Sequence, residues 1–255
     1  MQLLANPAGN YSFLRGIAPY SAGVVAAPGY EIVRAILAQP LPWREGFQRI
    51  EQHLGQWNRP LAALCAMELR SPAPFSFAGF ADFNGAYQAR LAEVGLLLDG
   101  VNPLARTHVA PAVNPPDEPS LYAFSYTVPS PMPPNSPHPF PTFIVAGAGD
   151  LRDQADLSPS AIVRPGETSS GAMQEKAAVV LAVMQERLFG LGHTWADVSS
   201  IGVYTVQPLH PLLDTLLLSL HESTRNGILW HYSRPPISGL EFEMDLRGLR
   251  AEERI

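Results

Sequence analysis

The chain has 255 residues, of which 46% are apolar and 16% charged, enough to bury a sizeable core, so a disordered chain is excluded. Its net charge of −6 and the lack of a Lys/Arg cluster argue against nucleic-acid binding. A single cysteine, Cys65, excludes an intrachain disulfide framework and is typical of a reducing compartment. No run reaches about 18 uninterrupted apolar residues. We therefore expect a soluble, cytoplasmic protein without membrane or nucleic-acid partners.

Apolar spacing in the first half predicts the order strand, helix, strand, helix, strand, strand. The helices are indicated by apolar side chains that recur at helical spacing, and the strands by short β-prone runs between them. The expected ranges are strand 30–37, helix 43–57, strand 61–69, helix 83–94, and strands 106–110 and 121–128.

A proline-rich stretch lies near the midpoint of the chain. Residues 129–141, PSPMPPNSPHPFP, can form neither a helix nor a central strand, because proline lacks the backbone N–H and fixes its φ angle. We interpret this stretch as an extended connector between two domains, residues 1–128 and 142–255.

The second half repeats the pattern of the first. The expected ranges are strand 143–147, helix 173–191, strand 198–206, helix 213–220, and strands 228–233 and 240–246. Internal repetition on this scale indicates a tandem duplication. We predict an α+β fold of two similar sandwiches, each a mixed sheet with two helices on one face.

The strand that opens at Arg106 carries the strongest candidate for ligand binding. Side chains alternate along a strand, so Arg106 and His108 share a face while Thr107 points the other way. An arginine there can hold a carboxylate bidentately, and the histidine adds a titratable group within reach. On this stretch alone, a solvated edge charge or half of a structural ion pair is the more common role.

Three motifs of the first half resemble the Rid/YjgF (reactive intermediate deaminase) family, whose fold is related to bacterial chorismate mutase. Residues 16–24, GIAPYSAGV, resemble the family's opening motif, whose tyrosine, here Tyr20, faces the active site. The segment FNGAY, residues 83–87, is similar to a helix whose asparagine, here Asn84, lines the same cleft. The letters ART resemble P-A-R-[ST], whose arginine, here Arg106, grips the substrate carboxylate.

The second half resembles the same family through different motifs. Residues 143–147, FIVAG, resemble its first core strand, and residues 235–244, PPISGLEFEM, resemble its closing strand. The resemblance places the first glutamate of that strand, Glu241, near a catalytic water. Residues 225–228, RNGI, replace P-A-R-[ST] in this half, and the first half lacks the glutamate. The arginine and the acid therefore survive in different halves, and we expect one whole site to form from both, within a chain or between chains.

The resemblance implies a deaminase that hydrolyses a small enamine or imine carboxylate, such as a 2-aminoacrylate-like or 2-aminomuconate-like compound. Arg106 would hold the carboxylate, Glu241 would orient or deprotonate water, and Tyr20 and Asn84 would donate hydrogen bonds. His108 is either an acid or base, or a packing or interface residue. The family's sites lie between subunits of a trimer, so we expect a homo-oligomer, with a trimer preferred.

Two alternatives remain open on the sequence. One is a lyase, hydrolase or tautomerase on a cyclic carboxylate, resembling chorismatase, which an oversized cleft near Arg34 and His108 would favour. In this interpretation Arg34 binds substrate. The other is a non-catalytic ligand-binding protein, favoured if Arg106 is locked to a carboxylate such as Asp99. The histidines lack metal-ligand spacing, so we expect neither a metal nor another cofactor.

Overall fold

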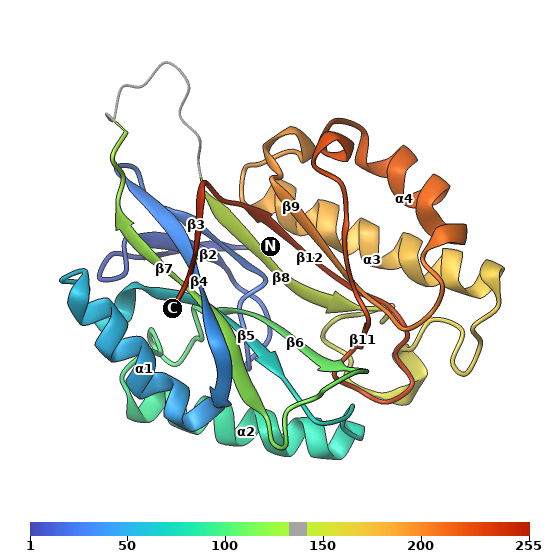
Figure 1. The fold of residues 1–255 in the computed structure, drawn as a ribbon, viewed down its shortest axis with the longest axis horizontal. Coiled ribbons are helices and arrows are strands. Elements are labelled where there is room, and N and C mark those ends of the chain that lie inside the picture. The colour runs from blue at the N-terminus through green and yellow to red at the C-terminus, as the bar shows by residue number, and fades with distance from the viewer. Residues whose placement is uncertain (133–141) are drawn as a thin grey trace.

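The two apolar repeats fold into two sheets that pack face to face, with helices on the outer faces (Figure 1). The structure, a computed structural model, describes residues 1–132 and 142–255. Small and β-branched side chains meet between the sheets, including Val24, Ala66, Ala105 and Ala146. Larger apolar side chains fill the two outer layers under the helices. The molecule thus has four layers, with the two sheets in the middle and the helices outside.

The first repeat forms a six-stranded mixed sheet in the order β11-β6-β5-β7-β4-β13. Strands β5 and β6 pair in parallel, whereas β7 pairs antiparallel with both β4 and β5. Helices α1 and α2 cover its outer face. The bounds are β4 Tyr30–Pro42, α1 Trp43–Gln56, β5 Leu64–Arg70, α2 Phe77–Glu93, β6 Ala105–Pro111, β7 Ser120–Pro129, β11 Ser233–Arg234 and β13 Ala251–Arg254.

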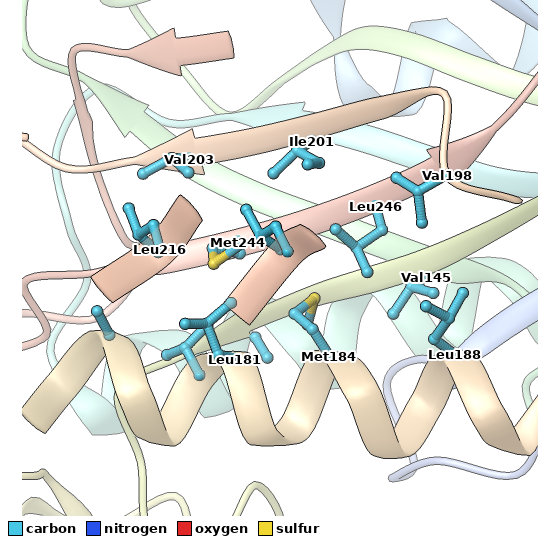
Figure 2. Packing of buried hydrophobic residues seen from close by; sticks show 14 of the residues in the cluster. Val145, Leu181, Met184, Leu188, Val198, Ile201, Val203, Leu216, Met244 and Leu246 are labelled. Atoms are coloured by element: carbon cyan, nitrogen blue, oxygen red, sulfur yellow. The ribbon is translucent and has the colours of Figure 1, made fainter. Parts of the chain in front are cut away.

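The second repeat forms a seven-stranded mixed sheet in the order β1-β2-β3-β8-β12-β9-β10. Helices α3 and α4 cover its outer face, and Figure 2 shows Leu181, Met184 and Leu188 of α3 packed against side chains of β8, β9 and β12. The bounds are β1 Leu3–Asn6, β2 Tyr11–Leu14, β3 Gly23–Ala26, β8 Phe143–Gly149, α3 Ser170–Gly190, β9 Ser200–Tyr204, α4 Leu213–Leu220, β10 Leu229–His231 and β12 Glu243–Gly248.

The same strand order occurs in both sheets, which confirms the predicted α+β fold of two sandwiches. The first repeat has β4-β7-β5-β6 and the second has β8-β12-β9-β10, so equivalent strands occupy equivalent places. The predicted elements are found, with shifted ends. Helix α2 begins at Phe77 rather than residue 83, because the Ser76 side chain accepts a hydrogen bond from the Gly79 N–H and caps the helix there.

The sheets exchange strands across the middle of the chain. Strands β1, β2 and β3 of the first half extend the second sheet, since β3 pairs with β8. Conversely, β13 at the end of the chain pairs parallel with β4, and β11 pairs with β6. The division into 1–128 and 142–255 stays a prediction, and most of the expected connector, residues 133–141, lies outside the described residues. The exchange matters for the site, because it brings the segment before β3 against the start of β6.

Candidate active site

A small pocket lies where β6 of one sheet faces β8 and β12 of the other. Its volume is about 30 Å³, room for one or two water molecules. Polar side chains from both halves reach it, namely Tyr20, Arg106, His108, Gln154 and Glu243. Its remaining walls are Phe80, Gly147, Gly149, Leu151, Leu157, Pro236, Ile237 and Leu240. One chain therefore brings polar groups of both repeats to a single pocket.

Arg106 is a buried cation with a free donor. Its side chain is only 3% exposed, and its Nη2 donates to Asn84 Oδ1 at 2.7 Å. Its Nη1 has no partner within residues 1–132 and 142–255, and no carboxylate of those residues, Asp99 included, lies within ion-pair distance. Four rings lie 4.9–5.8 Å from the guanidinium carbon: Tyr20, Phe80, Phe83 and Tyr87. A desolvated guanidinium held this way is suited to a carboxylate ligand.

Tyr20 reaches the pocket because its backbone is tied to β6. The Ser21 N–H donates to Leu104 O at 2.8 Å, and Asn102 Nδ2 donates to Pro19 O at 2.8 Å. Residue 21 thereby pairs with Ala105 as an isolated parallel bridge. The ring of Tyr20 then lies 5.0 Å from the Arg106 guanidinium. The structure thus brings together Tyr20, Asn84 and Arg106, the three residues named by the first-half motifs.

The glutamate in the pocket is Glu243 rather than Glu241. Glu241 precedes β12, is partly exposed, and accepts a hydrogen bond from Gln207 Nε2 at 2.9 Å, so it does not line the pocket. The backbone N–H groups of Glu241 and Phe242 donate to Asp150 Oδ1 instead of to a neighbouring strand, and β12 begins only at Glu243. Glu243 is the first residue of β12, is 3% exposed, and faces the other sheet.

The environment of Glu243 favours its neutral form. Burial raises the pKa of this carboxyl well above its usual range, and Asp245 raises it further, while Arg106 and Arg187 only partly offset the effect. A Cβ on Gly147 would collide with the Glu243 carboxylate and would lie 3.2 Å from Thr107 Cα. Glycine at position 147 therefore makes room for the acid between the sheets. Arg106 can hold the carboxylate of a bound substrate, and the neutral carboxyl of Glu243 beside it can then donate a proton to another atom of that substrate.

His108 shares the pocket with Arg106, as strand alternation predicts. Its Nε2 lies 2.6 Å from Ser71 Oγ in a shared hydrogen bond, and its ring packs edge-on against Phe75 and Phe83. Burial lowers its pKa well below the usual range, and Arg106 lowers it further. His108 is therefore neutral at neutral pH, and its Nδ1 has no partner among the residues described.

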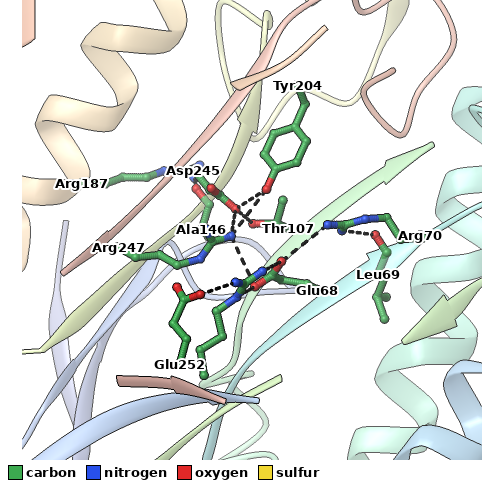
Figure 3. A network of polar contacts seen from close by, with 11 residues as sticks. Glu68, Leu69, Arg70, Thr107, Ala146, Arg187, Tyr204, Asp245, Arg247 and Glu252 are labelled. Atoms are coloured by element: carbon green, nitrogen blue, oxygen red, sulfur yellow. Dashed lines mark hydrogen bonds and ion pairs between the residues drawn. The ribbon is translucent and has the colours of Figure 1, made fainter. Parts of the chain in front are cut away.

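Arg34 does not line the pocket. It belongs to a buried ionic network between the sheets, shown in Figure 3 around Glu68 and Arg247. Arg34 Nε and Nη2 donate to the two Glu68 oxygens at 2.5 and 2.9 Å, and Nη1 donates to Glu252 at 3.0 Å. Burial alone would raise the pKa of Glu68, but Arg247 and Arg34 outweigh it and hold the pKa far below its usual range. This arginine is fully occupied by protein carboxylates.

The motifs assigned no role to two charged residues of the region, Glu243 and Arg187. The alternation of Glu243, Asp245 and Arg247 along β12 could have shown that all three face the other sheet. Arg187 of α3 carries no such signal, because one charge on a long helix is usually solvated.

In the described ranges no group of three His, Cys, Asp or Glu side chains could hold a metal ion. No helix among those residues is long and apolar enough to cross a membrane.

Comparison with known proteins identifies the family of the chain. The family model described as 2-aminomuconate deaminase CnbZ matches residues 3–253. The 2-amino-5-chloromuconate deaminase of Comamonas testosteroni is 42% identical over 240 residues, which cover 94% of each chain. Among solved structures, a chorismatase aligns over 89% of this chain and 77% of its own, with 15% identity and a TM-score of 0.49. TdcF of E. coli, solved with bound serine, aligns over 43% and 80%, with 14% identity and a TM-score of 0.32.

The family match decides between the functions that the sequence left open. It spans residues 3–253 and, with the chlorinated relative, confirms the prediction of a deaminase. Activity on a C–N bond is thereby supported, and the non-catalytic interpretation is not. The chain belongs to the 2-aminomuconate deaminase CnbZ family.

Proposed function

We propose that the chain hydrolyses 2-aminomuconate, or a close relative of it, to the corresponding 2-oxo acid and ammonia. The observation that carries the proposal is the juxtaposition of a buried arginine with a free Nη1, Arg106, and a buried carboxyl with a raised pKa, Glu243, in one pocket. The family and the chlorinated relative supply the substrate class. Arg106 would bind the carboxylate next to the amino-bearing carbon, which sets that carbon beside Glu243.

Glu243 takes the role that the sequence motif assigned to Glu241. In the neutral form it donates its proton to carbon of the enamine, which becomes an iminium ion. Water adds to the iminium carbon and gives a proton back to Glu243. Glu243 passes this proton to nitrogen, the C–N bond breaks and ammonia leaves. The proton on the new carbonyl oxygen then restores the Glu243 acid, so one water is consumed and one ammonia released.

The other pocket residues support this step without needing to ionise. Asn84 positions the Arg106 guanidinium through the hydrogen bond from Nη2. Tyr20 keeps its proton, because burial raises the pKa of its hydroxyl, and can donate to the substrate carboxylate. Neutral His108 can accept or donate through the free Nδ1. Arg34 has no part in the proposal, since protein carboxylates occupy its donors.

Ammonia release tests the proposal directly. The purified chain is supplied with 2-aminomuconate formed in situ by oxidation of its semialdehyde, and ammonia is measured by a coupled dehydrogenase assay. We expect one ammonia for each substrate consumed, together with loss of the dienamine absorbance. Ammonia formation no faster than in the enzyme-free mixture would refute the proposal.

A homo-oligomer, with a trimer preferred, remains part of the proposal. Leu229 and Trp230 of β10 and the nearby Tyr232 are large apolar side chains that are exposed at the edge of the seven-stranded sheet. An edge strand with exposed aromatic side chains is a favourable surface for a second copy. Location in the cytoplasm likewise remains a proposal.

A further inference from the structure

A second buried arginine lies next to the pocket and has no counter-ion among the residues that the structure describes. Arg187 of α3 is 2% exposed, and its Nη1 donates to the carbonyl oxygens of Ala146 at 2.9 Å and Gly147 at 3.1 Å. Figure 3 shows the side chain reaching toward Ala146. No carboxylate in the described ranges lies within ion-pair distance of it, and its Nε is unpartnered there. Buried charges are normally paired, so this guanidinium calls for an anion.

Arg187 lines a second cavity that adjoins the first. This outer cavity has a volume of about 210 Å³, and its wall also includes Arg15, Gly16 and Asp153. Tyr20 and Gln154 line both cavities and separate them. Burial raises the pKa of Tyr20, and the Arg187 and Arg106 guanidiniums both oppose that rise, Arg187 more strongly. Both guanidiniums, Arg106 in the inner pocket and Arg187 in the outer cavity, therefore act on Tyr20, which lines both.

The inner pocket alone is too small for the proposed substrate. Its volume of about 30 Å³ accommodates a water molecule or two, or a carboxylate group, but no six-carbon chain. A ligand whose first carboxylate occupies Arg106 therefore extends out of this pocket, and Tyr20 and Gln154 form the wall that the pocket shares with the outer cavity. Beyond them lies the larger cavity with Arg187 in its wall. A linear unsaturated diacid carries its two carboxylates at opposite ends, which matches one cation in each cavity.

We infer that Arg187 binds the distal carboxylate of a dicarboxylic substrate, and that the enzyme selects linear diacids over monoacids through this contact. The inference rests on the proposed function, because it assumes that Arg106 binds the carboxylate beside the amino group. Arg15 also lines the outer cavity, but it is exposed, so solvent screens its charge. The buried guanidinium of Arg187 is desolvated and already oriented by two carbonyl groups, so it is the stronger anchor.

A matched pair of ligands isolates the second carboxylate. Muconate and sorbate share the same six-carbon diene, but muconate ends in a second carboxylate where sorbate ends in a methyl group. Calorimetry on the full chain measures their affinities without turnover, so absence of deamination does not affect the result. We expect muconate to bind about 10- to 100-fold more tightly than sorbate. Equal affinities would overturn the inference even if 2-aminomuconate is deaminated.

Variants test whether Arg187 causes the preference for muconate over sorbate. In Arg187→Met, muconate affinity should fall to that of sorbate, while sorbate affinity stays unchanged and so reports an intact inner pocket. Glu186→Gln, at an exposed neighbour on α3, should keep the wild-type ratio. Equal weakening of both ligands in Arg187→Met would show a structural role only. Should this variant not fold, Arg187→Lys decides: an intermediate ratio is expected, and a wild-type ratio would overturn the assignment.

Discussion

Replacement of Arg106 by methionine is expected to lower kcat/KM for the deaminated substrate by about 10²- to 10³-fold, because a desolvated charge pair with the substrate is lost. Sorbate and muconate should both lose affinity. The thermal midpoint of the variant should be equal to or above that of the wild type, because Arg106 is a buried charge with no ion-pair partner in the described part of the chain. Steady-state kinetics and a thermal scan check the two halves of the prediction.

Arg34→Met is the matched control. Arg34 is also a buried arginine, but Glu68 and Glu252 hold it. Its loss leaves buried Glu68 with fewer partners and should cost about 3–5 kcal/mol of stability, while the folded fraction keeps its kcat. If Arg106→Met retained full activity, or if Arg34→Met lost activity without losing stability, the two arginines would have been assigned the wrong roles.

Glu243→Gln should lower kcat by about 10²- to 10⁴-fold with little change in KM, because the amide keeps the shape of the acid but cannot transfer a proton. The pH profile carries a second signature. The pKa of Glu243 is raised, so its proton is present at neutral pH and is lost as the pH rises through that raised value. Wild-type kcat should therefore fall on the alkaline side, and this limb should be absent from the residual activity of the variant.

Glu241→Gln separates the two glutamates of the closing segment. Glu241 is hydrogen-bonded to Gln207 outside the pocket, so this variant should keep near wild-type kcat and the same alkaline limb. A larger loss in Glu241→Gln than in Glu243→Gln would instead favour the role that the family resemblance gave to Glu241.

Periodicity predicted the repeated fold because each helix and strand carries its own apolar spacing. Helix α1, expected over 43–57, is observed as Trp43–Gln56, and strand alternation correctly placed Arg106 and His108 on one face. Which glutamate of the closing segment lines the pocket depends on a tertiary contact. Asp150, nearly a hundred residues earlier, binds the N–H groups before β12 and delays the start of the strand.

Features that depend on pairing across the chain had no local signal. The sequence gives no indication that β1, β2 and β3 join the sheet of the second repeat, because strands of either sheet satisfy the same alternation. Arg187 occupies an ordinary helical position, and the sequence does not show that its Nη1 bonds to the backbone carbonyls of Ala146 and Gly147 in β8. Such contacts become visible only once the layers are assembled.

A crystal structure of the chain with muconate tests most directly the claim that one polypeptide builds a whole site from its two repeats. The account predicts one carboxylate on Arg106 Nη1, with the Glu243 carboxyl of the same chain beside the adjoining carbon. A ligand bound at Arg34, or one that meets Arg106 and Glu243 of different chains, would contradict it.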